Sequence, residues 1–185
     1  MPSRTCSPLV ERSVAVRLAP LRTDDRGRVS ELLIATAAFS ADKIGVALEL
    51  FDEVYGHAEP NEGADYEFVG AYDDAGRLLG YACFGATPAT EGTYDLYWLA
   101  VHPAAQGRGA GRALVRWVEQ ELGTRGARLL VVETASRADY AHTREFYARG
   151  GYIEAARVRE FYAPADDRII LTTRFTGREV GVATR

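Results

Sequence analysis

The spacing of apolar residues along the chain changes repeatedly between the two-residue period of strands and the longer period of helices. Short apolar runs bounded by turn residues predict strands at 14–18, 66–73, 78–86, 93–101, 128–133, 152–162 and 168–175. Apolar residues at helical spacing predict helices that start at Thr23 or Asp24, near Asp42, at about Gly109 and at about Tyr140. The run at 128–133 is apolar almost throughout, which is typical of a strand buried on both faces.

The order of these elements predicts an α/β fold. Residues 73–76 form a strong turn signal, so the strands on either side should pair as an antiparallel hairpin. The strand at 93–101, the helix after it and the strand at 128–133 read as a β-α-β crossover, and a second hairpin follows. We therefore expect a single domain over residues 14–175, built on a mixed, mostly antiparallel sheet of about six to seven strands with helices on both faces. Residues 1–13 and 176–185 are expected to be flexible termini.

Composition narrows the class of protein. The chain has 185 residues, of which 47% are hydrophobic and 26% are charged, and this suits one folded domain better than a disordered chain. Cys6 and Cys83 have no partner at metal-ligand spacing, so we expect free thiols and no metal site. The sequence shows neither a signal-peptide core nor an apolar run near the ~20 residues of a membrane span. We expect a cytoplasmic protein that does not bind membranes.

Charge is divided unevenly between the two halves of the chain. Residues 1–92 carry 15 acidic and 8 basic side chains, whereas residues 93–185 carry 11 acidic and 14 basic ones. This basic excess is too weak for nucleic-acid binding, which needs clustered Lys and Arg, but it suits a small anionic ligand. The acidic residues around 51–67 are either ordinary solvated charges or side chains that attract a cationic amine.

A glycine-rich turn, VHPAAQGRGAGRA at 101–113, joins a predicted strand to a predicted helix. Its glycines let a ligand approach the backbone, and the free N–H groups at a helix start favour an anion such as phosphate. The turn lacks the Lys-Ser/Thr pair of a Walker loop, and Arg112 stands where a dinucleotide-binding fingerprint has its third glycine. Composition alone leaves a phosphate site and a ligand-free connection about equally open.

The hexapeptide Gln106-Gly107-Arg108-Gly109-Ala110-Gly111 resembles the Q/R-x-x-G-x-G/A signature of the GNAT superfamily of acyl-CoA-dependent N-acyltransferases. The neighbouring elements follow the GNAT order, with a Phe-Tyr pair and a Gly-Tyr pair at the matching distance. The resemblance implies that acetyl-CoA is the acyl donor, with its pyrophosphate on backbone N–H groups of the turn and its pantetheine arm beside the preceding strand. The residues implied in donor binding are Leu99, Ala100, Val101, Gln106, Gly107, Arg108, Gly109, Ala110, Gly111 and Arg112.

The resemblance also implies two catalytic residues. Tyr147 looks like the GNAT tyrosine that donates a proton to the departing sulfur, and the alternative is a tyrosine that only packs in the core. Glu133 resembles the general base of the ribosomal-protein amino-terminal acetyltransferases. Those proteins also carry a Tyr-Tyr-Pro-like stretch where this chain has Phe161-Tyr162-Ala163-Pro164. A carboxylate held at a strand end by backbone donors or an arginine is an equal alternative for Glu133.

The candidate acceptor-binding residues are Tyr94, Asp95 and Tyr97, because they lie on the strand that leads into the donor site. One functional hypothesis is an N-acetyltransferase that moves acetyl from acetyl-CoA to a primary amine by direct attack in a ternary complex. The other is an acyl-CoA-binding sensor or interaction module without catalysis, and a nicotinamide-dependent oxidoreductase is more remote. Tyr147 and Glu133 favour the enzyme. The expected partner is a small-molecule or peptide amine, and a homodimer is left open.

Overall fold

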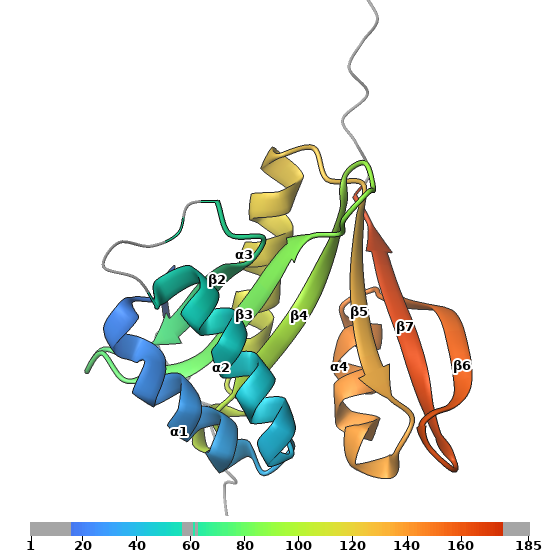
Figure 1. The fold of residues 1–185 in the computed structure, drawn as a ribbon, viewed down its shortest axis with the longest axis horizontal. Helices are drawn as coiled ribbons and strands as arrows, with labels where there is room; N and C mark the ends of the chain where they lie inside the picture. The colour runs from blue at the N-terminus through green and yellow to red at the C-terminus, as the bar shows by residue number, and fades with distance from the viewer. Residues whose placement is uncertain (1–15, 57–60, 62, 176–185) are drawn as a thin grey trace, which may run out of the picture.

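A computed structural model describes residues 16–56, 61 and 63–175 as one α/β domain (Figure 1). The strands form one sheet in the order β1-β2-β3-β4-β5-β7-β6, in which only the β4–β5 pair is parallel. This confirms the predicted mixed, mostly antiparallel sheet. The strands are β1 (Arg17–Pro20), β2 (Glu67–Tyr72), β3 (Leu78–Ala86), β4 (Thr93–Val101), β5 (Leu129–Ala135), β6 (Ile153–Ala163) and β7 (Asp166–Arg174). The α-helices are α1 (Arg26–Thr36), α2 (Ala41–Tyr55), α3 (Ala110–Thr124) and α4 (Ala141–Arg149).

Helices cover both faces of the sheet, as the sequence predicts. On one face α1 and α2 enclose a hydrophobic cluster with Leu33 and Phe51 at its centre. On the other face α3 and α4 enclose a second cluster that includes Leu114, Val118 and Tyr147. Figure 1 shows α1 and α2 in front of the sheet and α3 and α4 behind it. Burial of these apolar faces is the main force that holds the three layers together.

Most boundaries differ from the prediction by one or two residues, and two of the differences have a clear physical reason. The first helix begins at Arg26, because residues 23–25 form a 3₁₀ turn around the buried carboxylate of Asp25. That carboxylate accepts hydrogen bonds from the Arg22 N–H at 3.0 Å and from the Tyr72 hydroxyl at 2.7 Å. Strand β1 continues through Pro20, because β1 lies at the edge of the sheet and a proline there breaks no inner ladder.

Several expectations concern absences or lie outside the described residues. The proposed flexible termini and Cys6 fall outside them. Within the described ranges, no helix has the length and apolarity to cross a membrane. The same ranges contain no group of three or more His, Cys, Asp or Glu side chains that could hold a metal ion. Cys83 is a free, buried thiol, and burial raises its pKa, so the reactive thiolate is disfavoured.

Strands β4 and β5 pair over only part of their length. The parallel register joins residues 93–96 to residues 129–132 and then stops. Tyr97 is an extra residue in β4 opposite the Cys83–Phe84 step of β3, and such a β-bulge bends its strand. Residues 97–101 of β4 and 133–135 of β5 therefore diverge, and we call this place the split. Figure 1 shows the two strands separating toward the end where α1 meets α2.

Candidate functional site

The glycine-rich turn lies at the end of β4, beside the split. Gly107 and Gly109 have φ angles of 70° and 89°, in the left-handed region that glycine adopts without steric cost. The first hydrogen bond of α3 runs from the Ala113 N–H to the Gly109 carbonyl, at 2.9 Å. In the part of the chain that the structure describes, the N–H groups of residues 107–112 consequently donate to no acceptor.

These N–H groups lie at the N-terminus of α3, where the helix dipole adds partial positive charge, and such an arrangement can bind an anion. A Cβ built on Gly107 or Gly109 meets no protein atom within 4 Å, so the space beside the turn is open. Arg108 and Arg112 are exposed on either side. Gln106 differs from the expectation, because its N–H donates to Pro103 at 3.2 Å and its side chain donates to the Val101 carbonyl at 3.1 Å. Gln106 shapes the turn, and its backbone N–H is not free to bind a ligand.

The edge of β4 that faces the split is open. The His102 N–H donates to the Leu79 carbonyl of β3 at 2.8 Å, so by alternation Ala100 also turns its backbone toward β3. Leu99 and Val101 turn their backbone N–H and C=O groups the other way, into the split. An extended chain that carries amide groups can pair with this edge as an additional strand.

Tyr147 lies in α4 with its ring enclosed. The rings of Phe146 and Tyr152 pack against it with centroid separations of 5.1 and 5.2 Å, and only 3% of Tyr147 is exposed. Burial raises the pKa of the Tyr147 phenol above its ordinary value of 10, so the hydroxyl is protonated at neutral pH. The Tyr152 hydroxyl donates to Glu119 at 2.8 Å, whereas the Tyr147 hydroxyl has no partner among the described residues.

Helix α4 approaches the glycine-rich turn closely. A Cβ built on Gly111 of α3 would lie 3.4 Å from the Val101 side chain and 3.7 Å from the ring of Phe146. The buried Thr134 hydroxyl of β5 lies on the face that α3 and α4 cover and finds no partner among the described residues. The structure thus places the neighbour of Tyr147, the end of β4 and the start of α3 together.

Glu133 faces the opposite side of the sheet from Tyr147. In β5, Leu130, Val132 and Thr134 are buried toward α3 and α4, so alternation turns Glu133 toward the side of α1 and α2. The Glu133 side chain is 40% exposed and forms an ion pair with Arg168 of β7. This arginine was not identified from the sequence. Its ion pair is consistent with the alternative in which Glu133 is a carboxylate held at a strand end by an arginine.

The three candidate acceptor residues are placed differently. Tyr94 and Asp95 lie in the paired part of β4, and the Asp95 carboxylate accepts a 2.6 Å hydrogen bond from the Thr87 hydroxyl. Tyr97 lies at the bulge where the split begins, is 37% exposed and packs against Tyr66 with ring centroids 5.1 Å apart. Burial, and secondly the Asp95 carboxylate, raise the pKa of Tyr97 to about 12. Of the three residues, only Tyr97 lies at the start of the split, and its ring packs against Tyr66 and over Gly85 of β3.

Contacts between distant parts of the chain span the open end of the split. The Tyr140 hydroxyl donates to the Ala38 carbonyl at 3.1 Å, although 102 residues separate them. Lys43 of α2 places its Nζ 5.3 Å from the centre of the Tyr162 ring on β6. No local sequence pattern predicts either contact.

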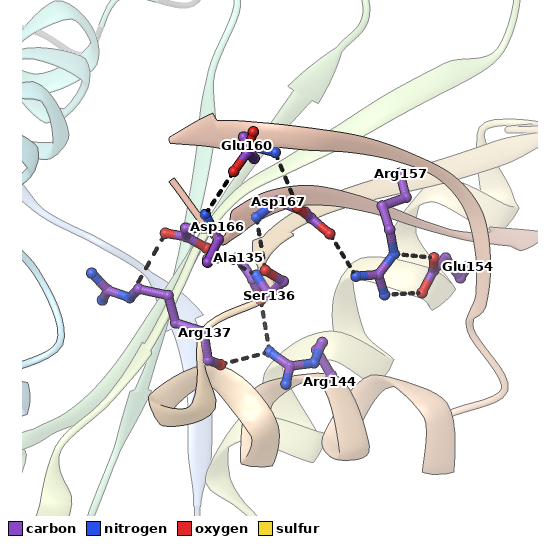
Figure 2. Close-up of polar contacts among 10 residues, drawn as sticks. Ala135, Ser136, Arg137, Arg144, Glu154, Arg157, Glu160, Asp166 and Asp167 are labelled. Atoms are coloured by element: carbon purple, nitrogen blue, oxygen red, sulfur yellow. Dashed lines mark hydrogen bonds and ion pairs between the residues drawn. The ribbon is translucent and has the colours of Figure 1, made fainter. Parts of the chain in front are cut away.

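Arg144 is a further residue that the sequence analysis missed. Its guanidinium donates to the carbonyls of Ala135 and Arg137 at 2.7 and 2.9 Å, as Figure 2 shows. These bonds tie α4 to the end of β5.

In the acidic 51–67 stretch, Asp52 forms a 2.6 Å ion pair with Arg26, so the charge of this carboxylate is already neutralised.

Comparison with known proteins gives one family. The family model for the acetyltransferase (GNAT) family matches residues 35–152. A Desulfovibrio desulfuricans protein assigned to the GNAT acetyltransferases is 42% identical, with a TM-score of 0.79 over 88% of this chain and 99% of that one. Comparison with curated proteins found no match.

Two more distant structures share the fold. The ribosomal-protein-S18-alanine N-acetyltransferase of Escherichia coli is 22% identical, with a TM-score of 0.70 over 92% of this chain and all of that one. An aminoglycoside 6′-N-acetyltransferase crystallised with coenzyme A is 17% identical, with a TM-score of 0.65 over 88% of this chain and 98% of that one. At these identities the likeness concerns the fold alone.

Proposed function

The chain belongs to the GNAT family of acetyltransferases, and from this membership we propose that it transfers acetyl from acetyl-CoA to a primary amine by direct attack in a ternary complex. The observation that carries the proposal is the free row of N–H groups at residues 107–112, beside an open strand edge and next to α4. An acetyl-CoA-dependent reaction also agrees with a cytoplasmic location.

Backbone groups would hold the donor. The N–H groups of residues 107–112 would bind the pyrophosphate, and Leu99 and Val101 would pair with the amides of the pantetheine arm. Bound acetyl-CoA supplies a thioester carbonyl that is activated toward an amine. An N–H of the open β4 edge would stabilise the negative charge that develops on the carbonyl oxygen. The buried Thr134 hydroxyl, which has no partner among the described residues, supports the presence of a polar ligand group in the split.

Two side chains would move protons on opposite faces of the sheet. Glu133 would accept the proton that an ammonium group must lose before the nitrogen can attack. Tyr147 would donate its phenolic proton to the departing sulfur, and its raised pKa supports the protonated form that this step requires. Tyr97, exposed at the bulge, would contact the acceptor, whereas Tyr94 and Asp95 have weaker support.

The test is incubation of the protein with acetyl-CoA and a panel of primary amines, with detection of the released thiol. Release that depends on an amine and is lost in Tyr147→Phe supports the proposal. Tight binding of CoA without thiol release for any amine would instead favour the acyl-CoA-binding module.

We expect Gly109→Val to raise the apparent KM for acetyl-CoA about tenfold or more. No protein atom lies within 4 Å of the new Cβ, so valine would occupy space that the pyrophosphate needs. The left-handed φ of 89° adds a backbone cost of about 1–2 kcal/mol. Calorimetric titration with CoA and a melting curve measure the two effects. Gly126→Val is the matched control, because Gly126 has a φ of 75° and open space but lies beyond the end of α3. Equal CoA affinities in the two variants would contradict the assignment.

Arg108→Ala and Arg112→Ala should weaken CoA binding mainly at low ionic strength. Both side chains are exposed, and at about 0.15 M salt charges are screened over roughly 8 Å. Titrations in low and high salt measure the difference. Arg116→Ala, an exposed arginine one turn further along α3, should have a smaller effect. A loss of affinity that salt does not change would argue against a screened contribution.

A further inference from the structure

The hairpin between β6 and β7 contains an irregular segment. In the register of the two strands, Val158 lies opposite Arg168 and Ala163 lies opposite Asp166. Residues 159–162 of β6 therefore face the single residue Asp167 of β7. We call residues 159–162 the hairpin bulge, a local departure from regular pairing that re-aims side chains.

The backbone of this segment is strained. Glu160 in the hairpin bulge has a φ angle of 50°, and Ala165 in the turn between β6 and β7 has a φ angle of 61°. Both lie in the left-handed region that residues with a Cβ rarely adopt. Such conformations persist only where the surroundings hold them, and they concentrate at sites where a protein must present particular groups.

Asp167 supplies the restraint. Its Oδ1 accepts a 3.0 Å hydrogen bond from the strained Glu160 N–H, and its Oδ2 accepts a 3.0 Å bond from Arg157. The Asp167 N–H donates to Ser136 Oγ at 2.7 Å, which ties the hairpin to the end of β5. The Glu160 carboxylate accepts the Ala165 N–H at 3.2 Å. Figure 2 shows Asp167 between Glu160 and Arg157. The Glu160 N–H and then Arg157 lower the pKa of Asp167, which keeps this carboxylate ionised at neutral pH.

The hairpin bulge turns two consecutive aromatic rings toward the same side. Phe161 is 51% exposed and Tyr162 is 41% exposed, and their rings are nearly perpendicular. The Arg168 guanidinium, which pairs with Glu133, lies 4.8 Å from the Phe161 ring centre, and Lys43 lies against Tyr162. In a regular strand successive side chains point to opposite faces, so the bulge is what brings both rings to the side of Glu133 and α2.

We propose that Asp167 is a positioning residue, which fixes the hairpin bulge so that Phe161 and Tyr162 bind an apolar substituent next to the acceptor amine. This inference rests on the proposed function of the split. It names the acceptor class as an amine with an aromatic or large aliphatic substituent. Lys43 beside Tyr162 would repel a second positive charge, so a polyamine is a poor acceptor.

The first experiment compares phenethylamine with spermidine as acceptors. The wild-type protein should prefer phenethylamine. Asp167→Ala should raise the KM for phenethylamine about tenfold, with kcat and the KM for acetyl-CoA changed by less than about threefold. Arg157→Ala is the matched control, since it removes one partner of Asp167 but leaves the Glu160 bond in place, and it should change the KM for phenethylamine by less than about threefold.

Three outcomes would overturn the inference: a preference for spermidine, equal effects of the two variants, or parallel changes in kcat and both KM values. Absence of thiol release from the wild-type protein with every amine would defeat the proposed function itself.

A second experiment does not depend on activity or on the stability of one variant. The Glu160 amide should exchange its hydrogen slowly in the wild-type protein, and about tenfold or more faster in Asp167→Ala than in Arg157→Ala. Equal exchange in both would show that Asp167 does not hold the bulge.

If Asp167→Ala does not fold, Phe161→Ala removes an exposed ring and leaves the Asp167–Glu160 bond intact. It should raise the KM for phenethylamine and not that for spermidine, and an unchanged KM for phenethylamine would overturn the role of the rings.

Discussion

Replacing Tyr147 with phenylalanine should lower kcat by roughly 10²- to 10⁴-fold, or about 3–5 kcal/mol of barrier, and should leave acetyl-CoA binding nearly intact. The substitution keeps the ring between Phe146 and Tyr152 and removes only the hydroxyl. Because that hydroxyl has no partner among the described residues, the melting temperature should hardly change. A large loss of rate without a loss of stability separates a proton donor from a core tyrosine.

Tyr152→Phe is the matched control, and it should behave in the opposite way. Its ring packs 5.2 Å from that of Tyr147, but its hydroxyl donates to Glu119. Loss of this hydrogen bond should cost about 1 kcal/mol of stability and leave kcat within about threefold of wild type. The measurements are steady-state thiol release, a CoA titration and a melting curve on each variant. A kcat for Tyr147→Phe within about threefold of wild type would exclude Tyr147 as the acid.

The pH profile of the wild-type protein provides a further check on Tyr147. Burial disfavours the phenolate and raises the pKa of Tyr147 above 10, so the donor form persists as the pH rises through the neutral and mildly alkaline range. Rising pH also deprotonates the acceptor amine, which favours attack. The rate should therefore show no descending limb from Tyr147 below about pH 10. A descending limb near neutral pH that disappears in Tyr147→Phe would contradict the raised pKa.

Local sequence patterns were sufficient for most elements of the fold and for the place of the glycine-rich turn between a strand and a helix. The aromatic and branched run at 93–101 predicted β4 with the bounds that the structure gives, Thr93–Val101. The positive φ angles of Gly107 and Gly109 follow from their place between a strand and a helix, because glycine tolerates such a turn. These features depend on residues close together in the sequence.

The acceptor side depends on register and on contacts between distant segments, which local patterns do not specify. Alternation predicts which face Glu133 takes, but only the pairing of β5 with β7 brings Arg168 beside it. The bulge at Tyr97 and the hairpin bulge are irregularities in strand pairing, and the periodic spacing of apolar residues does not predict them. The contact between Tyr140 and Ala38 joins segments 102 residues apart. The contacts on which the proposed recognition of the acceptor rests are therefore the part that local sequence patterns could not predict.

Glu133→Gln should lower kcat/KM for an ordinary primary amine by about 10²- to 10³-fold at neutral pH. An amide has nearly the same shape and can still accept a hydrogen bond from Arg168, but it does not take up a proton. The ion pair is partly exposed, so its loss should change stability by no more than about 1 kcal/mol. Thiol release and a melting curve on the variant measure these effects.

The alternative for Glu133, a carboxylate that only partners Arg168, makes a different prediction. If the carboxylate were structural, Glu133→Gln and Arg168→Gln would lose the same ion pair and show similarly small changes in rate. If Glu133 is the base, the loss in Glu133→Gln should depend on how strongly the acceptor holds its proton. A weakly basic acceptor such as 2,2,2-trifluoroethylamine, which is already deprotonated at neutral pH, should restore most of the rate relative to phenethylamine. A loss that is the same for both amines would rule out Glu133 as the residue that deprotonates the acceptor, because a group that only holds Arg168 has no means of sensing the basicity of the amine.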